Sequence, residues 1–266
     1  MKILLVNKYL YRKGGAETYF IKLGEYLKSL GNEVEYFGMA DERNCVGNRV
    51  EAYTENIDFH KKSLKHITYP FKIIYSVNAR KQIRKVLSDF KPDVVHLNNF
   101  NYQLTPSIIY EIKKRNIPIV YTAHDVQLVC PNHKLKNDYT DGLCRKCDGG
   151  KYFECVKNNC VHSSKIRSIL GAVEAWYYKL RHTYKMIDLT VCPSEFMEKE
   201  ISRNDDINGR TVTMYNFIDE IKPLGAECEN YVLYFGRYSE EKGISNLVKA
   251  AKKLSNIPFV FAGKGE

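Results

Sequence analysis

The sequence has no long apolar run, and none approaches the roughly 18 consecutive apolar residues that a membrane-spanning helix needs. Its start, MKILLVNKYL, holds an apolar stretch of four residues, which is too short for the hydrophobic region of a signal peptide. Glycine and proline are sparse, at 16 and 8 of 266 residues, and we find no internal repeat or low-complexity segment. These absences exclude collagen-like, repeat and disordered chains, and we expect a cytoplasmic protein.

What is present is typical of a folded chain. The 266 residues are 44% hydrophobic and 27% charged, which is enough to bury the core of one large domain or two ordinary ones. The formal net charge is +10, so an anionic partner is favoured over a cationic one. Phosphate is the group that the common anionic partners share, whether nucleotide, nucleic acid or lipid headgroup.

Short apolar runs rich in β-branched and aromatic residues recur along the chain. Continuous runs of this kind indicate strands that are buried on both faces, as in a parallel sheet. The runs are Ile3–Val6, Val34–Phe37, Val94–Leu97, Ile119–Thr122, Leu189–Cys192, Val232–Phe235 and Phe259–Ala262.

Helical patterns lie between these runs. Apolar residues recur at helical spacing from Phe20 to Leu30, and Gly31 follows as a stop signal. We expect further helices near residues 106–115 and after Ser194, a typical N-cap. Alternating strands and helices predict an α/β fold with a doubly wound, Rossmann-like parallel sheet and helices on both faces.

The chain divides by composition. Residues 1–215 hold most strands of the predicted sheet, and a cysteine-rich insertion occupies residues 130–162. Residues 216–230 carry Pro, Gly and acids without periodicity and read as a linker. Residues 231–266 hold one strand–helix–strand unit, so we expect an incomplete second Rossmann-like domain.

A glycine pair opens the first predicted helix. Gly14 and Gly15, followed by Glu17, let a ligand approach the backbone closely, and the free N–H groups of a helix N-terminus attract phosphate or carboxylate. The spacing lacks the G-x-G-x-x-G pattern, and a glycine that merely turns the chain is the alternative.

Polar side chains leave two predicted strands at one edge of the sheet. His124 and Asp125 follow the strand at Ile119, while His96 and Asn98 leave the strand at Val94. Ligands bind at the carboxyl ends of strands in open α/β sheets, so these residues are candidates for contact with a substrate. A structural histidine is the alternative.

A third candidate site follows the strand at Val232. Arg237 and Lys242 stand five positions apart across a strand-to-helix turn, where both can bind one diphosphate. Gly263 and Gly265 form another glycine turn after the last strand. A solvated basic loop is the alternative.

Taken together, the Gly14–Glu17 loop, His124-Asp125, the Gly236–Gly243 segment and Gly263–Gly265 resemble the motif series of family-4 glycosyltransferases of the GT-B fold. The resemblance implies sugar transfer from a nucleotide-sugar donor with retention of configuration and without a catalytic metal. It implies a polysaccharide, glycolipid or lipid-linked acceptor, as in cell-surface polysaccharide synthesis.

The resemblance also implies roles for individual residues. Those implied to bind the donor are Gly14, Gly15, Arg237, Lys242, Gly263 and Gly265. Those implied to act at the transferred sugar or on the acceptor side are His124, Asp125, His96, Asn98 and Glu17. Family members carry a pair of glutamates further downstream, which this sequence does not reach by Glu266. We therefore expect a fragment that by itself transfers little or no sugar.

Four cysteines crowd into the insertion: Cys144, Cys147, Cys155 and Cys160. This spacing in a loop-rich stretch predicts a structural, tetrahedral zinc site, for which Cys130 or His133 could replace one ligand. Free thiols or redox-active disulfides are the alternatives.

Two segments, His60–Lys85 and Lys165–Lys185, are both basic and aromatic, and the second contains Trp176. They could rest on an anionic membrane surface as a peripheral contact, or a helix could pack its aromatic side onto the sheet.

Two other functions remain open besides sugar transfer: a non-catalytic or degenerate carbohydrate-binding relative, and a zinc-stabilised nucleic-acid-binding protein. The positive charge is scattered and no nucleic-acid recognition motif is present, so we expect no nucleic-acid partner.

Overall fold

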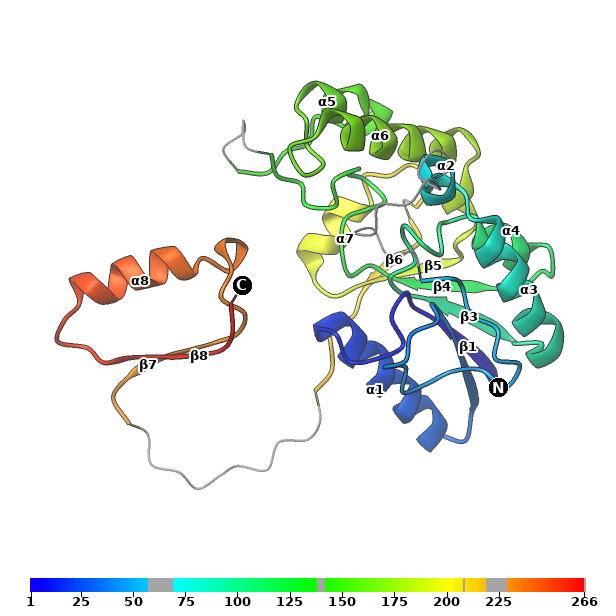
Figure 1. The fold of residues 1–266 in the computed structure, drawn as a ribbon, viewed down its shortest axis with the longest axis horizontal. Helices are drawn as coiled ribbons and strands as arrows, with labels where there is room; N and C mark the ends of the chain where they lie inside the picture. The colour runs from blue at the N-terminus through cyan, green and yellow to red at the C-terminus, as the bar shows by residue number, and fades with distance from the viewer. Residues whose placement is uncertain (57–68, 138–141, 208, 219–228, 266) are drawn as a thin grey trace. The chain divides into compact units, whose positions relative to one another are not determined.

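The chain forms two compact units, Met1–Phe217 and Ile218–Glu266, in a computed structural model (Figure 1). The structure describes residues 1–56, 69–137, 142–207, 209–218 and 229–265. Residues 60–68 of the predicted basic segment and most of the predicted linker lie outside these ranges. Within the described residues, no helix combines the length and apolar character needed to cross a bilayer.

The first unit is built on a six-stranded, fully parallel sheet, which confirms the predicted α/β class. The strand order is β2-β1-β3-β4-β5-β6. The strands are β1 (Lys2–Val6), β2 (Glu33–Phe37), β3 (Val94–Leu97), β4 (Ile119–Thr122), β5 (Leu189–Cys192) and β6 (Thr211–Thr213). All but β6 coincide with predicted apolar runs; β6 has the sequence TVT and is too short and polar to show such a run.

Both faces of this sheet are covered. Alternate side chains of each strand point to opposite sides, so one strand contributes to the apolar clusters on both faces. Ile3 and Leu5 of β1 pack in one cluster with Phe20 of helix α1 (Gly15–Ser29). Leu4 and Val6 belong to a second cluster, with residues of the helices on the other side. Burial on both faces is the reason that the strands appear in the sequence as unbroken apolar runs.

Helix α1 lies close to β2 because Gly24 leaves space for a tyrosine. A Cβ on Gly24 would come within 2.2 Å of the Tyr36 hydroxyl. The helix ends where predicted, since Gly31 follows it with a φ of +81°, in the left-handed region that glycine adopts without strain.

The other face carries α3 (Val77–Phe90), which follows the short α2 (Tyr69–Ile74), and α4 (Ile108–Lys113). Our sequence analysis missed α3, although its buried residues recur at helical spacing from Ala79 to Phe90 and would have revealed it. The Ser76 side chain caps α3 by accepting a hydrogen bond from the Ala79 N–H at 3.1 Å.

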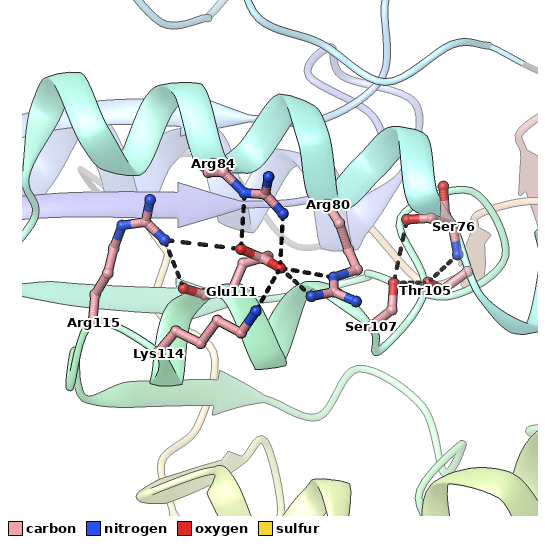
Figure 2. Close-up of polar contacts among 8 residues, drawn as sticks. All are labelled: Ser76, Arg80, Arg84, Thr105, Ser107, Glu111, Lys114 and Arg115. Atoms are coloured by element: carbon pink, nitrogen blue, oxygen red, sulfur yellow. Dashed lines mark hydrogen bonds and ion pairs between the residues drawn. The ribbon is translucent and has the colours of Figure 1, made fainter.

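A buried carboxylate joins α3 to α4. Glu111 of α4 accepts hydrogen bonds from Arg80 and Arg84 of α3, and Lys114 and Arg115, which directly follow α4, approach it as well (Figure 2). Burial acts to raise the pKa of Glu111, but the two arginine hydrogen bonds outweigh it and hold the pKa at about 2. Glu111 is therefore a charged group that four cations share.

The chain between β4 and β6 forms the rest of the first unit. It contains the 3₁₀ turn η2 (Asp148–Gly150), α5 (Phe153–Lys157), α6 (Lys165–Leu180), the 3₁₀ turn η3 (Thr183–Met186) and α7 (Glu195–Ile201). Ser194 caps α7 as predicted, because its side chain accepts a hydrogen bond from the Met197 N–H. The aromatic residues of α6 are only partly directed inward: Tyr178 is buried, whereas Trp176 and Tyr177 are half-buried.

The second unit contains β7 (Val232–Phe235), the 3₁₀ turn η4 (Glu240–Lys242), α8 (Ile244–Lys253) and β8 (Phe259–Ala262). Its two strands pair in parallel, which confirms the predicted strand–helix–strand unit. The strands remain largely exposed; Phe235, for example, is 79% exposed.

Candidate functional site

The polar residues predicted at one edge of the sheet do come together there. β3 and β4 are neighbours, and His124, just past β4, lies 3.0 Å through Nε2 from the Asn98 Oδ1 atom, just past β3. A carboxamide oxygen only accepts, so Nε2 carries the proton and Nδ1 is left with a lone pair. Burial lowers the pKa of His124 to about 4, and the ring is therefore neutral near pH 7.

His96 faces a neighbouring strand instead of the edge. Its Nε2 lies 2.7 Å from the Thr122 hydroxyl of β4, and burial together with His124 lowers its pKa to about 4. This contact with a strand residue favours the structural histidine that the sequence left open as the alternative, and a role of His96 on the acceptor side stays a prediction.

Asp125 lies beside a histidine from the cysteine-rich insertion. Its Oδ2 is 3.3 Å from His133 Nδ1, and its Oδ1 accepts a hydrogen bond from the Gln127 N–H at 2.9 Å. Burial would raise the pKa of Asp125, but the His133 and Gln127 contacts and the charge of Lys8 lower it overall. Asp125 is thus a carboxylate that is ready to accept hydrogen bonds.

A lysine and two tyrosines adjoin this carboxylate. Lys8, two residues past β1, places Nζ 3.4 Å from Asn101 Oδ1 and over the rings of Tyr9 and Tyr102. Tyr102 in turn stacks on His133, with ring centroids 5.6 Å apart. Burial lowers the pKa of Lys8, and Asp125 is among the groups that oppose this shift. Flat rings beside charged and amide groups are suited to binding sugars and anions.

The glycine loop opens α1 at the same edge, after β1. Gly14 is the N-cap and supplies no side-chain cap, while a Cβ on Gly15 would meet nothing within 4 Å. The Lys13 Nζ lies 3.7 Å from the Tyr9 ring centroid beside this helix end. Free N–H groups at a helix N-terminus attract anions in general. Glu17 is buried in the first turn.

An aromatic series leads from His124 to the end of the first unit. The Tyr19 ring lies 5.3 Å from the His124 ring and 5.2 Å from the Phe217 ring. Phe217 is the last residue of this unit, so the chain leaves it beside the candidate site.

In the second unit, Arg237 pairs with Glu241, and Lys242 ends η4 on the same turn. The two predicted glycines have packing roles here. A Cβ on Gly263 would lie 1.8 Å from the Gly236 carbonyl oxygen, and one on Gly265 would lie 2.8 Å from Tyr238 Cβ. Glycine is therefore needed at both positions for the close approach of two loops.

The predicted zinc site is not supported. Cys130, Cys144, Cys147, Cys155 and Cys160 do line one small cavity. Within the described ranges, however, no group of three or more His, Cys, Asp or Glu residues is arranged to hold a metal ion. The thiols make other contacts, and burial keeps that of Cys147 protonated by raising its pKa to about 12. Cys130 donates to the Asn132 side chain instead, and Cys144 accepts from Asn137.

The sequence analysis missed Lys8, Asn101 and Tyr102 and considered His133 only as a metal ligand. Lys8 could have been found, because it follows β1 at the same carboxyl edge as His124 follows β4. Asn101, Tyr102 and His133 lie in loops without periodicity, and only the folded chain brings them to Asp125.

Comparison with known proteins places this geometry in context. Residues 13–221 match Glycosyltransferase Family 4. A relative from Klebsiella pneumoniae, described as an uncharacterized 42.6 kDa protein in the cps region, is 25% identical over 280 residues, covering 99% of this chain and 68% of its own.

Two solved structures show a similar fold. Sucrose-phosphate synthase from Thermosynechococcus elongatus has a TM-score of 0.60 at 14% identity, covering 98% of this chain and 61% of its own. HepE from Anabaena, in complex with UDP and glucose, has a TM-score of 0.54 at 16% identity, covering 100% of this chain and 62% of its own. The chain thus spans less than two thirds of either solved structure.

Proposed function

Because the chain belongs to glycosyltransferase family 4, we propose that it acts in the transfer of a sugar, with retention of configuration, from a nucleotide-sugar donor to a glycan, glycolipid or lipid-linked acceptor. One observation carries the proposal: the family match, over residues 13–221, covers most of the unit in which His124, Asn98, Asp125 and Lys8 gather at the carboxyl edge of the sheet. Ligands bind at this edge in open α/β sheets.

His124 and Asp125 are proposed to contact the sugar that is transferred. The neutral His124 ring can accept a hydroxyl hydrogen bond at Nδ1, since Nε2 is engaged with Asn98. The Asp125 carboxylate can accept a second hydroxyl or stabilise the positive charge that develops on the sugar in an oxocarbenium-like transition state.

Arg237 and Lys242 are proposed to bind the donor diphosphate, and Gly15 at the α1 N-terminus is proposed to take part in donor binding through its backbone N–H. A diphosphate leaving group gains negative charge as the sugar departs, and fixed cations and N–H groups stabilise that charge. Arg237 must exchange its present partner Glu241 for phosphate, which keeps the guanidinium neutralised until the donor arrives.

The acceptor is proposed to belong to a surface polysaccharide. The Klebsiella relative is named for its place in a cps region, and that name supports this class of acceptor. The aromatic and charged surroundings of Asp125 suit a polar glycan better than an apolar acceptor.

Donor binding is tested by titrating UDP and ADP into the protein by calorimetry. We expect Arg237→Ala and Lys242→Ala each to weaken binding by about tenfold or more, because each removes a charge-assisted contact. Lys252→Ala, which removes an exposed lysine of α8 in the same unit, is the matched control and should bind as the parent does. Absence of binding by the parent would contradict the proposed donor.

Because this chain by itself is expected to transfer little or no sugar, transfer is tested in a parent that also carries the family's downstream glutamate pair, by the release of nucleoside diphosphate from nucleotide sugars in the presence of glycan acceptors. His124→Ala should lower kcat by on the order of a hundredfold with little effect on folding. Lys199→Ala, on the exposed surface of α7, is the control. Equal turnover by the His124→Ala variant and the parent would remove His124 from the reaction.

A further inference from the structure

Helix α6 presents an apolar stripe to the outside of the first unit. Ile166, Ile169, Val173 and Leu180 are 73%, 41%, 40% and 80% exposed. Their spacing of three, four and seven residues places them on one side of the helix. Single exposed apolar residues are ordinary, but an aligned set marks a contact surface.

The side of α6 that packs inward carries few aliphatic side chains. Ser168, Ala172 and Tyr178 are its buried residues, and the Ser168 hydroxyl donates to the Ser164 carbonyl oxygen. A surface helix usually turns its larger aliphatic side chains toward the core, whereas four of those on α6 are exposed. The aliphatic side chains of α6 are thus available to something outside the unit.

Two aromatic residues border the stripe. The Trp176 ring donates its N–H to the Gly150 carbonyl oxygen at 3.0 Å, and the Tyr177 ring packs against Tyr75 at 6.2 Å. Both rings are half-buried and fixed in place. Tryptophan and tyrosine with one polar and one apolar side are the residues enriched where a protein meets the headgroup region of a bilayer.

Basic residues stand at both ends of the stripe. Lys165 and Arg167 lie at the start of α6, and Lys179 and Arg181 lie at its end. In the described part of the chain, none of these four forms an ion pair with a carboxylate. The charges at both ends are therefore available to an anionic surface.

The positive surface continues onto α3 and α4. The Arg181 guanidinium lies 5.3 Å from the Tyr110 ring centroid, and the Arg80 guanidinium lies 6.0 Å from the same ring. Arg80 belongs to the group that surrounds Glu111 (Figure 2), where four cations share one carboxylate. Arg84 and Lys114 of this group are 53% and 63% exposed, so an excess of positive charge remains at the surface.

We propose that this face, the α6 stripe with its flanking cations, docks on an anionic lipid bilayer. Ile166, Ile169, Val173 and Leu180 enter the boundary between headgroups and acyl chains, while the lysines and arginines at either end contact lipid phosphates. The exposed aliphatic side chains suit the acyl-chain boundary of such a bilayer, and the cations at both ends of the stripe suit its anionic headgroups. The proposal does not depend on sugar transfer, although it would bring the protein to a lipid-linked acceptor.

The test uses the only tryptophan of the chain, Trp176, as an internal probe at the border of the stripe. Vesicles of phosphatidylcholine, with or without phosphatidylglycerol, are titrated into the whole protein while tryptophan emission and vesicle co-flotation are recorded. We expect a blue shift and co-flotation with the phosphatidylglycerol vesicles, and a loss of binding as salt is added.

Variants locate the contact. Ile169→Glu and Val173→Glu should each weaken vesicle partitioning by about tenfold or more, because each puts a charge at the lipid boundary. Both side chains are already exposed, so circular dichroism should be unchanged. Phe196→Glu is the matched control, since Phe196 is an apolar residue of α7 that is 47% exposed. Arg181→Glu should also weaken binding, whereas Lys199→Glu on α7 should not.

Four results would overturn the proposal. The first is no binding to phosphatidylglycerol vesicles, and the second is equal binding to neutral vesicles. The third is an equal effect of Phe196→Glu and Val173→Glu. The last is a blue shift that appears on raising the protein concentration without lipid, which would identify a second copy of the chain as the occupant of the stripe.

Discussion

At the residue scale, burial sets the charge of the groups around the candidate site. His96 and His124 have pKa values of about 4, against an ordinary value of 6.5, because both rings are removed from water. Glu174 of α6 is shifted the other way, to about 7 from 4.5, for the same reason. Desolvation disfavours the charged form in each case, and the two residue types therefore respond to pH in opposite directions.

The pH dependence of stability follows from these shifts. Between pH 6.5 and 4 the unfolded chain protonates His96 while the folded chain does not, so this residue lowers the free energy of unfolding as the pH falls. The His96→Gln variant lacks this effect. We expect its stability relative to the parent, measured by urea unfolding, to improve steadily from pH 7 to pH 4.5.

The Glu174→Gln variant should show the opposite trend. As the pH rises from 4.5 to 7, the unfolded chain releases the Glu174 proton and the folded chain retains it, which destabilises the fold. Replacing the carboxyl group removes this cost, so the variant should gain stability relative to the parent as the pH rises. Parallel pH profiles for the two variants would contradict at least one of the two assignments, and flat profiles would contradict both.

At the element scale, the buried Glu111 carboxylate links α3 and α4. Its side chain is 2% exposed and is contacted by Arg80 and Arg84, of which Arg80 is itself largely buried. Glu111→Ala leaves these cations without a partner, and we expect a loss of about 3 kcal/mol in the free energy of unfolding. Urea denaturation at neutral pH measures this loss.

An exposed ion pair supplies the control. Glu25 lies 3.6 Å from Arg12, with both side chains more than half exposed, and Glu25→Ala should change stability by less than about 1 kcal/mol. If the two alanine variants were equally stable, the contact between α3 and α4 would not depend on the buried charge.

Removing the N-cap of α7, a shorter helix, should have a smaller effect on the free energy of unfolding. Ser194→Ala removes the hydroxyl that accepts from the Met197 N–H, and we expect a loss of about 1 kcal/mol. Ser194→Gly should cost less, because glycine is tolerated at an N-cap. Thermal unfolding of both variants measures the difference, and equal losses would point to a role of the side chain other than capping.

At the scale of the whole molecule, the two units differ in how well their strands are protected. β1 is covered on both faces, whereas Leu233 of β7 and Val260 of β8 are 49% and 44% exposed. A two-stranded sheet with one helix is marginally stable by itself. We expect the amides of β7 and β8 to exchange with deuterium faster than those of β1 and β3, as measured by mass spectrometry. Equal protection of both sheets would refute the difference in stability.

The sequence by itself determined the class of the fold and most of its strands. A strand buried on both faces is mostly apolar, so β1, β3, β4 and β5 could be predicted from their apolar runs without knowledge of their neighbours. Local signals of the same kind identified the Gly31 stop and the Ser194 cap, because each acts within one turn of its helix. The order of the parallel strands then placed His124 and Asn98 at a shared edge.

Only the tertiary structure decided which distant groups meet. His133 reaches Asp125 and Tyr102 through loops, where no periodicity restricts the backbone. The cysteines share a cavity, yet their protonation depends on burial that spacing does not reveal. Which residues of α6 form the exposed stripe likewise depends on which side of the helix packs against the rest of the unit. Burial and contact are properties of the packed chain, and they set the charges and surfaces on which the function of this protein depends.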